Sequence, residues 1–332
     1  MPDLDKAAGG TVVVLGGTGF IGRHIGEAFT ALGARVHLVS PSAVPRSGAT
    51  ATVRLDVLAA SPREIAGLLA TVGADTVVNS AGRVWQADEP QMAASNAELV
   101  TKVTEALAAL PRQPRRPRLI QLGSVHEYGA GTPGGAIAED WPPAPVTPYG
   151  RTKLLGTQAV SRAVRDQDAD AVVLRLANVI GPGISVASLF GQVARHLAGA
   201  ARADALGEKP DELRLPPLRA ARDLVDVRDV ADAVVAAAVA PGARVRGRVI
   251  NVGRGEAVPV RDLIDRMIAL SGLEVPVSEE GGAPPNRNDV EWQSLDISLA
   301  RELLGWTPRR PLDTSLRELL AAVMPPVDER TG

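Results

Sequence analysis

Short apolar runs and longer amphipathic stretches alternate along the first half of the chain. An uninterrupted apolar run is typical of a strand buried on both faces, and an apolar residue at every third or fourth position is typical of a helix. The pattern predicts strands at Thr11–Leu15, Arg35–Val39, Val53–Leu55, Asp75–Val78 and Leu119–Leu122. It predicts intervening helices at Ile21–Leu32, Pro62–Val72 and Gln91–Leu110. This alternation indicates a parallel sheet covered by helices on both faces.

The second half begins in the same way and then changes. A helix at Thr147–Arg165 and a strand at Ala171–Leu176 continue the alternation, and the helix Arg228–Val239 with the strand Val249–Val252 can rejoin the sheet. The other helices are expected near Ser188–Ala198, Val260–Leu270, Ile297–Leu304 and Leu312–Val323. We therefore predict an α/β fold, a doubly wound parallel sheet with a smaller C-terminal lobe. We assign residues 11–178 and 224–252 to the sheet, 179–223 and 253–325 to the lobe, and 1–10 and 326–332 to flexible tails.

Composition and charge exclude several classes of function. With 45% hydrophobic and 22% charged residues, the 332-residue chain resembles an ordinary globular protein. A formal net charge of −2 provides no basic surface for nucleic acid or an acidic membrane, and no apolar run is long enough to span a bilayer. The absence of cysteine and the scatter of the four histidines argue against a metal site. No targeting signal is visible, so we expect a cytoplasmic protein.

A cluster of glycines lies between the first predicted strand and the first predicted helix. It reads Gly16-Gly-Thr18-Gly19-Phe20-Ile21-Gly22, with the spacing GxxGxxG. Glycines permit a tight turn and let backbone N–H groups approach a pyrophosphate at the N-terminus of a helix. Because a strand precedes the cluster and a helix follows it, dinucleotide binding is the best interpretation.

The end of the second strand indicates which dinucleotide is bound. An acidic residue there would accept a hydrogen bond from the 2′-hydroxyl of the adenosine ribose in NAD, whereas a basic residue favours the 2′-phosphate of NADP. This chain has Ser40 at that place, Arg46 shortly after it, and no acid. We therefore expect NADP as the cofactor, with NAD as the alternative.

Tyr149 and Lys153 form a second chemical feature. The chain has two tyrosines and, beside 32 arginines, four lysines, so this spacing rarely arises by chance. A separation of four residues places both side chains on one face of a helix, where the ammonium is expected to lower the pKa of the phenol toward the range of an acid/base catalyst. Ser124 ends the fifth strand, at the carboxyl edge where open α/β sheets bind ligands. Its hydroxyl can hydrogen-bond the substrate oxygen that Tyr149 protonates.

The glycine loop, Ser124 and the Tyr149/Lys153 pair together resemble the extended short-chain dehydrogenase/reductase family, specifically its nucleotide-sugar epimerase/dehydratase/reductase branch. The resemblance spans about residues 11–323. It includes Asp56-Val57, Asn79-Ser80-Ala81-Gly82, the segments 174–182 and 222–230, and Leu304-Gly305-Trp306-Thr307-Pro308. It implies a Rossmann-type sheet, a substrate-binding C-terminal lobe, a nucleotide-diphosphate sugar as substrate and a homodimer.

The resemblance also assigns roles to residues. Those expected to contact the cofactor are Gly16, Thr18, Gly19, Phe20, Ile21, Gly22, Ser40, Arg46, Asp56, Val57, Ser80, Ala81, Gly82, Tyr149 and Lys153. The expected catalytic residues are Ser124, Tyr149 and Lys153. The expected substrate contacts are Ser124, His126, Asn178, Arg222 and Arg287, the arginines being suited to bidentate binding of phosphate. His126 could instead be structural, and Asn96 could be either a support for Lys153 or an ordinary helix residue.

Departures from the family pattern narrow the range of reactions that we expect. Family dehydratases carry an acidic pair just after the active-site hydroxyl, where this chain has Val125 and His126, so dehydration is disfavoured. After Asn96 the chain reads Ala97-Glu98, without the Gly-Thr of many epimerases. We therefore expect an NAD(P)-dependent reductase of a nucleotide-linked 4-keto-6-deoxyhexose, with Tyr149 as proton donor. A nucleotide-sugar 4-epimerase is the alternative, and a non-catalytic cofactor-binding regulator or a non-sugar ketone reductase is less favoured.

Overall fold

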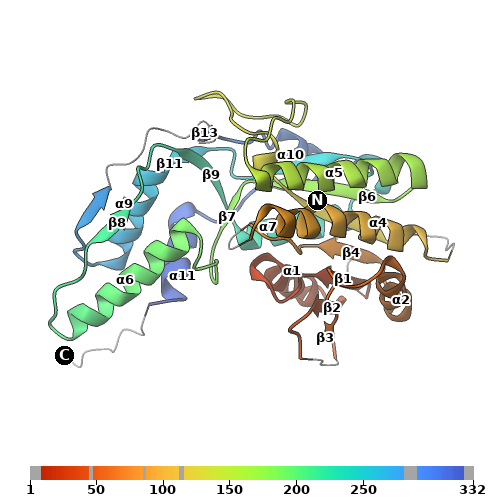
Figure 1. Ribbon diagram of the computed structural model, residues 1–332, viewed down its shortest axis with the longest axis horizontal. Helices are drawn as coiled ribbons and strands as arrows, with labels where there is room; N and C mark the ends of the chain where they lie inside the picture. The colour runs from red at the N-terminus through yellow and green to blue at the C-terminus, as the bar shows by residue number, and fades with distance from the viewer. Residues whose placement is uncertain (1–8, 45–47, 85–86, 112–115, 280–289, 325–332) are drawn as a thin grey trace.

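Seven parallel strands form the central sheet of the computed structural model, which describes residues 9–44, 48–84, 87–111, 116–279 and 290–324. The strand order is β10-β6-β5-β4-β1-β2-β3 (Figure 1). The strands are β1 (Thr11–Leu15), β2 (Arg35–Ser40), β3 (Thr50–Arg54), β4 (Thr76–Asn79), β5 (Arg118–Ser124), β6 (Ala171–Leu176) and β10 (Val249–Val252). The predicted doubly wound parallel sheet is confirmed, including the return of the late strand β10 beside β6.

The apolar residues of the strands alternate between two hydrophobic clusters, one on each face of the sheet. In β1, Val12 and Val14 belong to one cluster and Val13 and Leu15 to the other, as the period of two along a strand requires. The first cluster contains residues of α1 (Phe20–Ala31), α7 (Val227–Val239) and α10 (Ser298–Leu304). The second contains residues of α2 (Pro62–Val72), α4 (Leu99–Ala108) and α5 (Pro148–Gln167). The sheet is therefore buried on both faces.

The helix predicted at Gln91–Leu110 is interrupted. It consists of α3 (Glu89–Ala93), the π-helical turn η2 (Ala94–Glu98) and α4. The π-helical turn packs closely against α5, because a Cβ atom at Gly156 would lie 2.3 Å from the carbonyl oxygen of Asn96. Such turns are frequent at functional sites, and hydrophobic periodicity does not reveal them.

The remaining elements form a smaller part of the molecule, on the left of Figure 1. The helices α6 (Leu189–Ala205), α9 (Val260–Ser271) and α11 (Leu312–Ala321) surround a third hydrophobic cluster. Short strands accompany them: β7 (Asn178–Ile180), β9 (Ala221–Asp226), β11 (Ala257–Pro259) and β13 (Trp292–Gln293) in one sheet, and β8 (Leu213–Leu215) with β12 (Val277–Glu279) in another. The 3₁₀ turn η3 (Val125–Glu127) and α8 (Gly242–Val245) complete the list. The exact boundaries of the two lobes stay a prediction.

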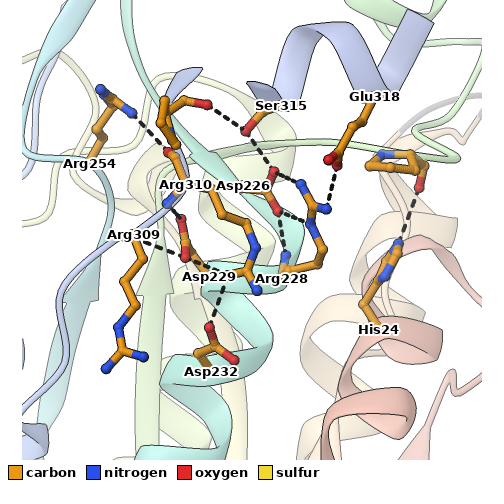
Figure 2. A network of polar contacts seen from close by, with 12 residues as sticks. His24, Asp226, Arg228, Asp229, Asp232, Arg254, Arg309, Arg310, Ser315 and Glu318 are labelled. Carbon is orange, nitrogen blue, oxygen red and sulfur yellow. Dashed lines mark hydrogen bonds and ion pairs between the residues drawn. The ribbon is translucent and has the colours of Figure 1, made fainter. Parts of the chain in front are cut away.

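A network of acidic and basic side chains joins α7 to the C-terminal segment (Figure 2). Asp226 caps α7: its carboxylate accepts hydrogen bonds from the backbone N–H and the guanidinium of Arg228 and from Ser315 Oγ of α11, at 2.6–2.8 Å. Arg228 also pairs with Glu318 of α11. Although burial opposes it, the hydrogen bonds from Arg228 and Ser315 hold the pKa of Asp226 below its usual value. The N-terminus of α7 thus holds α11 in place.

A second contact joins α1 to the chain that leaves β7. His24 Nε2 lies 3.2 Å from the carbonyl oxygen of Pro182, and the Arg23 guanidinium donates to the same oxygen.

Within the described residues, no helix is both long and apolar enough to cross a membrane.

Candidate active site

A cavity of about 900 Å³ lies at the carboxyl ends of the central strands, where the smaller part of the molecule faces them. Ligands bind at this edge of open α/β sheets, at the point where the strand order reverses, which here is between β1 and β4. The predicted site residues that line the cavity are Gly19, Phe20, Ile21, Gly22, Ser80, Ala81, Gly82, Ser124, His126, Tyr149, Lys153, Asn178 and Arg222. Segments far apart in the sequence therefore meet in one site.

The glycine loop has the geometry of a phosphate cradle. Gly16 has a φ of +74°, and a Cβ atom there would lie 2.8 Å from the backbone of Ala81. A Cβ atom at Gly22 would lie 2.3 Å from the carbonyl oxygen of Gly16. Gly19 begins α1 without a side-chain cap, and the first turn of the helix carries no acidic residue. The N-terminal N–H groups of α1 are thus suited to the pyrophosphate of a dinucleotide.

The residues expected at the adenosine end lie beside the cavity rather than on its wall. Thr18 Oγ1 donates to Ser40 Oγ at 2.8 Å, at the buried end of β2. Asp56 is exposed and accepts a hydrogen bond from the backbone N–H of Leu58, while Val57 is buried in the hydrophobic cluster under α2. Arg46 falls outside the described residues.

Asn96 holds the loop that follows β4. Its side chain accepts from the N–H of Arg83 at 3.2 Å and donates to the carbonyl of Arg83 at 2.9 Å. It also donates to Thr152 Oγ1, next to Lys153 on α5, at 3.2 Å. Asn96 is 2% exposed and lies in the π-helical turn η2. Asn96 therefore ties the loop after β4 to α5 beside Lys153, and its role as a support for Lys153 itself stays a prediction.

Ser124 and Tyr149 lie together in the wall of the cavity. Ser124 is buried at the end of β5, where its Oγ accepts a hydrogen bond from the backbone N–H of His126 at 3.3 Å. Burial raises the pKa of Tyr149 to about 12; the side chain of Ser124 opposes the rise and the negative charge of Glu127 adds to it. The phenol is therefore protonated at neutral pH.

Lys153 lies on the same helix face but does not act on Tyr149 as expected. Its ammonium is buried and donates to the carbonyl of Leu122 in β5. Burial lowers the pKa of Lys153, and the charge of Glu127 opposes this. The pKa of Tyr149 is raised, and not lowered as expected, because the effect of burial is the largest.

The predicted substrate contacts gather around His126. Its ring lies edge-on to that of Tyr149, with 5.6 Å between ring centroids, and Asn178 lines the same cavity. Burial and the positive charge of Arg222 lower the pKa of His126 to about 4, so the imidazole is neutral at pH 7. Arg222 donates to the carbonyl of Ala221 at 3.0 Å. Arg287 falls outside the described residues.

Sequence reasoning missed the apolar part of the cavity wall. These residues come from the smaller part of the molecule and include Ile184, Leu189, Phe190, Leu218, Val260 and Val290. Nothing in their local pattern distinguishes them from core residues. Among the described residues, no group of three or more acidic or histidine side chains is arranged to hold a metal ion.

Comparison with known proteins identifies the family to which this chain is similar. The model of the NAD dependent epimerase/dehydratase family matches residues 12–253. The chain is 41% identical over 311 residues to dTDP-6-deoxy-L-talose 4-dehydrogenase (NAD(P)(+)) of Kitasatospora kifunensis, covering 94% of this chain and 95% of that protein. It is 31% identical to the UDP-glucose 4-epimerase of Azospirillum brasilense over 195 residues, covering 56% of this chain and 55% of that protein.

Solved structures agree with the sequence comparisons. MoeE5 in complex with UDP-glucuronic acid and NAD superposes with a TM-score of 0.78 at 26% identity, covering 94% of this chain and 98% of that one. The family model spans well over half of the chain, and the Kitasatospora enzyme is similar to almost all of it. This protein therefore belongs to the NAD dependent epimerase/dehydratase family and is an NAD(P)-dependent oxidoreductase of the extended short-chain dehydrogenase/reductase type.

Proposed function

We propose that this protein reduces the 4-keto group of a nucleotide-linked 6-deoxyhexose, with dTDP as the first nucleotide to test. The observation that carries this proposal is the 41% identity, over 94% of the chain, to a dTDP-6-deoxy-L-talose 4-dehydrogenase. Oxidation of a sugar alcohol at carbon 4 and reduction of the 4-keto sugar are one reaction in two directions. The 4-epimerase is less favoured, because the similarity to the Azospirillum epimerase covers little more than half of either chain.

Three residues would carry the chemistry that the protein supplies. A bound nicotinamide dinucleotide provides the hydride. Tyr149 would donate its phenolic proton to the carbonyl oxygen as that oxygen becomes a hydroxyl, and Ser124, which lines the same cavity, would orient the same oxygen. Lys153, which lies in the wall of the cavity, would hold the ribose next to the nicotinamide. The ketone would become a secondary alcohol, with a bound NAD(P)H as the source of the hydride.

The other predicted residues would bind the cofactor or the substrate. Gly16, Gly19 and Gly22 would leave room for the pyrophosphate, and Phe20, Ile21, Ser80, Ala81 and Gly82 would line its path. Thr18, Ser40 and Arg46 would face the adenosine ribose, where the lack of an acid favours NADP, and Asp56 and Val57 would lie next to adenine. Asn178, Arg222 and Arg287 would hold the sugar nucleotide, and the neutral imidazole of His126 would hydrogen-bond a sugar hydroxyl.

Larger-scale features of the proposal are a homodimer, a cytoplasmic location and a division of labour between two lobes. We assign cofactor binding to residues 11–178 and 224–252 and substrate binding to 179–223 and 253–325. The separate hydrophobic cluster around α6, α9 and α11 supports this division, whereas α10, within the last of these ranges, packs in the cluster on the central sheet. The mass of the purified protein, measured by light scattering, tests the dimer.

The test of the reaction is a pair of spectrophotometric assays. NADPH should be consumed in the presence of a dTDP-linked 4-keto-6-deoxyhexose, and NADP⁺ should be reduced by dTDP-6-deoxy-L-talose. Tyr149→Phe should lower kcat by about 10²- to 10⁴-fold while leaving NADPH binding within about twofold, because only the proton donor is lost. Interconversion of two 4-epimers without net use of free cofactor would instead identify an epimerase.

A further inference from the structure

Glu127 is a fully buried carboxylate immediately behind the candidate active site. It ends the 3₁₀ turn η3, three residues after Ser124, and its side chain is completely inaccessible to solvent. Three hydrogen bonds and an ion pair satisfy it. Oε1 accepts from the backbone N–H of Ser124 at 2.8 Å, and Oε2 accepts from Thr157 Oγ1 at 2.8 Å and from the Arg175 guanidinium at 2.8 and 2.9 Å.

These donors belong to the elements that carry the catalytic side chains. Ser124 ends β5, and Thr157 lies on α5 one turn beyond Lys153, which is itself one turn beyond Tyr149. Residues at this spacing follow one face of a helix. The carboxylate of Glu127 therefore bridges the strand that presents Ser124 and the helix face that presents Tyr149 and Lys153.

The surroundings hold the bridge in one geometry. Arg175, on β6, is 3% exposed and stacks over the ring of Tyr128 at 4.2 Å, and the Tyr128 hydroxyl donates to Asn251 at 2.9 Å. A Cβ atom at Gly123 would lie 2.7 Å from Oε1 of Glu127, so this carboxylate position requires glycine at 123. Neither the acid nor its partner can move without disturbing its neighbours.

Stability alone does not account for this arrangement. A buried ion pair is on balance no more stabilising than apolar residues of the same volume. The charge of Glu127 does, however, reach the active site: it raises the pKa of Tyr149 and opposes the fall in the pKa of Lys153 caused by burial. The charged groups that face it are Arg175 from β6 and Lys153 from α5.

We propose that Glu127 is a positioning residue of the reduction, which fixes Ser124 against the Tyr149–Lys153 face of α5 and keeps a negative charge behind them. The proposal rests on the function proposed above for Ser124, Tyr149 and Lys153. Glu127 touches neither the cavity nor the reacting atoms, and it acts through those three residues.

Two substitutions separate geometry from charge. Glu127→Gln keeps the shape and removes the charge, whereas Glu127→Asp keeps the charge but is too short to span the bridge. Each variant is measured for kcat and KM with NADPH and the dTDP-linked 4-keto-6-deoxyhexose. The absorbance of tyrosinate is titrated in the same variants, with and without Tyr149→Phe, so that the signal of Tyr128 cancels.

We expect both variants to lose about tenfold or more in kcat, with the KM for NADPH within about twofold of wild type. The titration midpoint of Tyr149 should fall by about one pH unit in Glu127→Gln and stay in place in Glu127→Asp. Glu318→Gln, which changes an ion-paired glutamate on α11, is the matched control and should match the wild type in both measurements.

Glu127→Gln leaves the Arg175 charge buried without its partner and can fail to fold. In that case the double variant Glu127→Gln/Arg175→Met, which removes both charges, takes its place. The proposal is overturned if Glu127→Gln, or the double variant in its place, keeps kcat within about twofold of wild type. It is also overturned if the titration midpoint of Tyr149 in that variant stays at the wild-type value. A wild-type protein that does not reduce the sugar would refute the proposed function, while the titration would still test the coupling of Glu127 to Tyr149.

Discussion

Tyr149 is the residue whose protonation state sets the direction in which the site works. With a pKa raised to about 12, chiefly by burial, the phenol is a proton donor throughout the neutral range. The reverse reaction, oxidation of an alcohol, needs the phenolate as base. The fraction of phenolate rises about tenfold per pH unit below the pKa.

This gives a prediction for the pH dependence of the two directions. Between about pH 6 and pH 10, reduction should be nearly independent of pH, while alcohol oxidation should accelerate steadily with pH. His126, whose pKa is lowered to about 4, should add no inflection in this range. Initial rates in both directions test this, and an oxidation rate that is flat across the range would contradict it.

At the residue scale, the sequence predicts chemistry best where rare residues coincide. Tyr149 and Lys153 were recognisable because tyrosine and lysine are scarce in this chain. The direction in which the pKa of Tyr149 is shifted could not be recognised from the sequence, because it depends on burial and on Glu127. Only the folded chain brings Glu127 near Tyr149. Glu127 itself resembles a surface acid until Thr157 and Arg175 are placed around it.

Among the elements, the glycine loop and α1 make the sharpest prediction. In Gly22→Ala, the added Cβ atom would lie 2.3 Å from the carbonyl oxygen of Gly16 and 2.8 Å from Ser80 Oγ. The loop must shift, so we expect the KM for NADPH to rise about tenfold or more, together with a lower Tm.

Gly67→Ala is the matched control for this prediction. Gly67 lies within α2 and has nothing within 4 Å of its Cβ position. Alanine there should leave the KM unchanged and raise the Tm slightly, because alanine favours the helix. Equal effects of the two substitutions on the KM would show that the close packing of the glycine loop does not matter for cofactor binding.

The elements of the central sheet could be predicted because most of its strands contain a short apolar run. Every residue of β1 and β6 is buried, for example. The short strands β8, β12 and β13 could not be predicted, because each has only two or three residues. In addition, β12 pairs with β8, some sixty residues away in the chain. Tertiary contacts, rather than local sequence, determine such strands.

At the scale of the whole molecule, the network around Asp226 holds the C-terminal segment on the sheet. Asp226→Asn should destabilise the protein by about 1–3 kcal/mol at neutral pH, because the contact of the buried carboxylate with the Arg228 guanidinium and the cap of α7 are weakened. Asp232→Asn is the control. Asp232 pairs with Arg310 and its side chain is 43% exposed, so this substitution should change the free energy of unfolding only slightly.

The pH dependence of this contribution has a definite sign. The pKa of Asp226 is lowered by folding, so its stabilisation is fully present above the ordinary value of 3.8 and is lost as the pH falls through the lowered value. The difference in unfolding free energy between wild type and Asp226→Asn, measured with urea, should therefore shrink in acid. A difference that grows in acid would contradict the assignment.

The transfer of a label from cofactor to sugar tests the central claim most directly. NADPH that carries deuterium at both hydrogens of nicotinamide C4 is incubated with the protein and a dTDP-linked 4-keto-6-deoxyhexose, and the product is analysed by mass spectrometry and NMR. We predict one deuterium per product, at C4 of the sugar, and one NADPH consumed for each. A 4-keto sugar that is recovered unreduced, with neither deuterium at C4 nor loss of NADPH, would contradict the reductase.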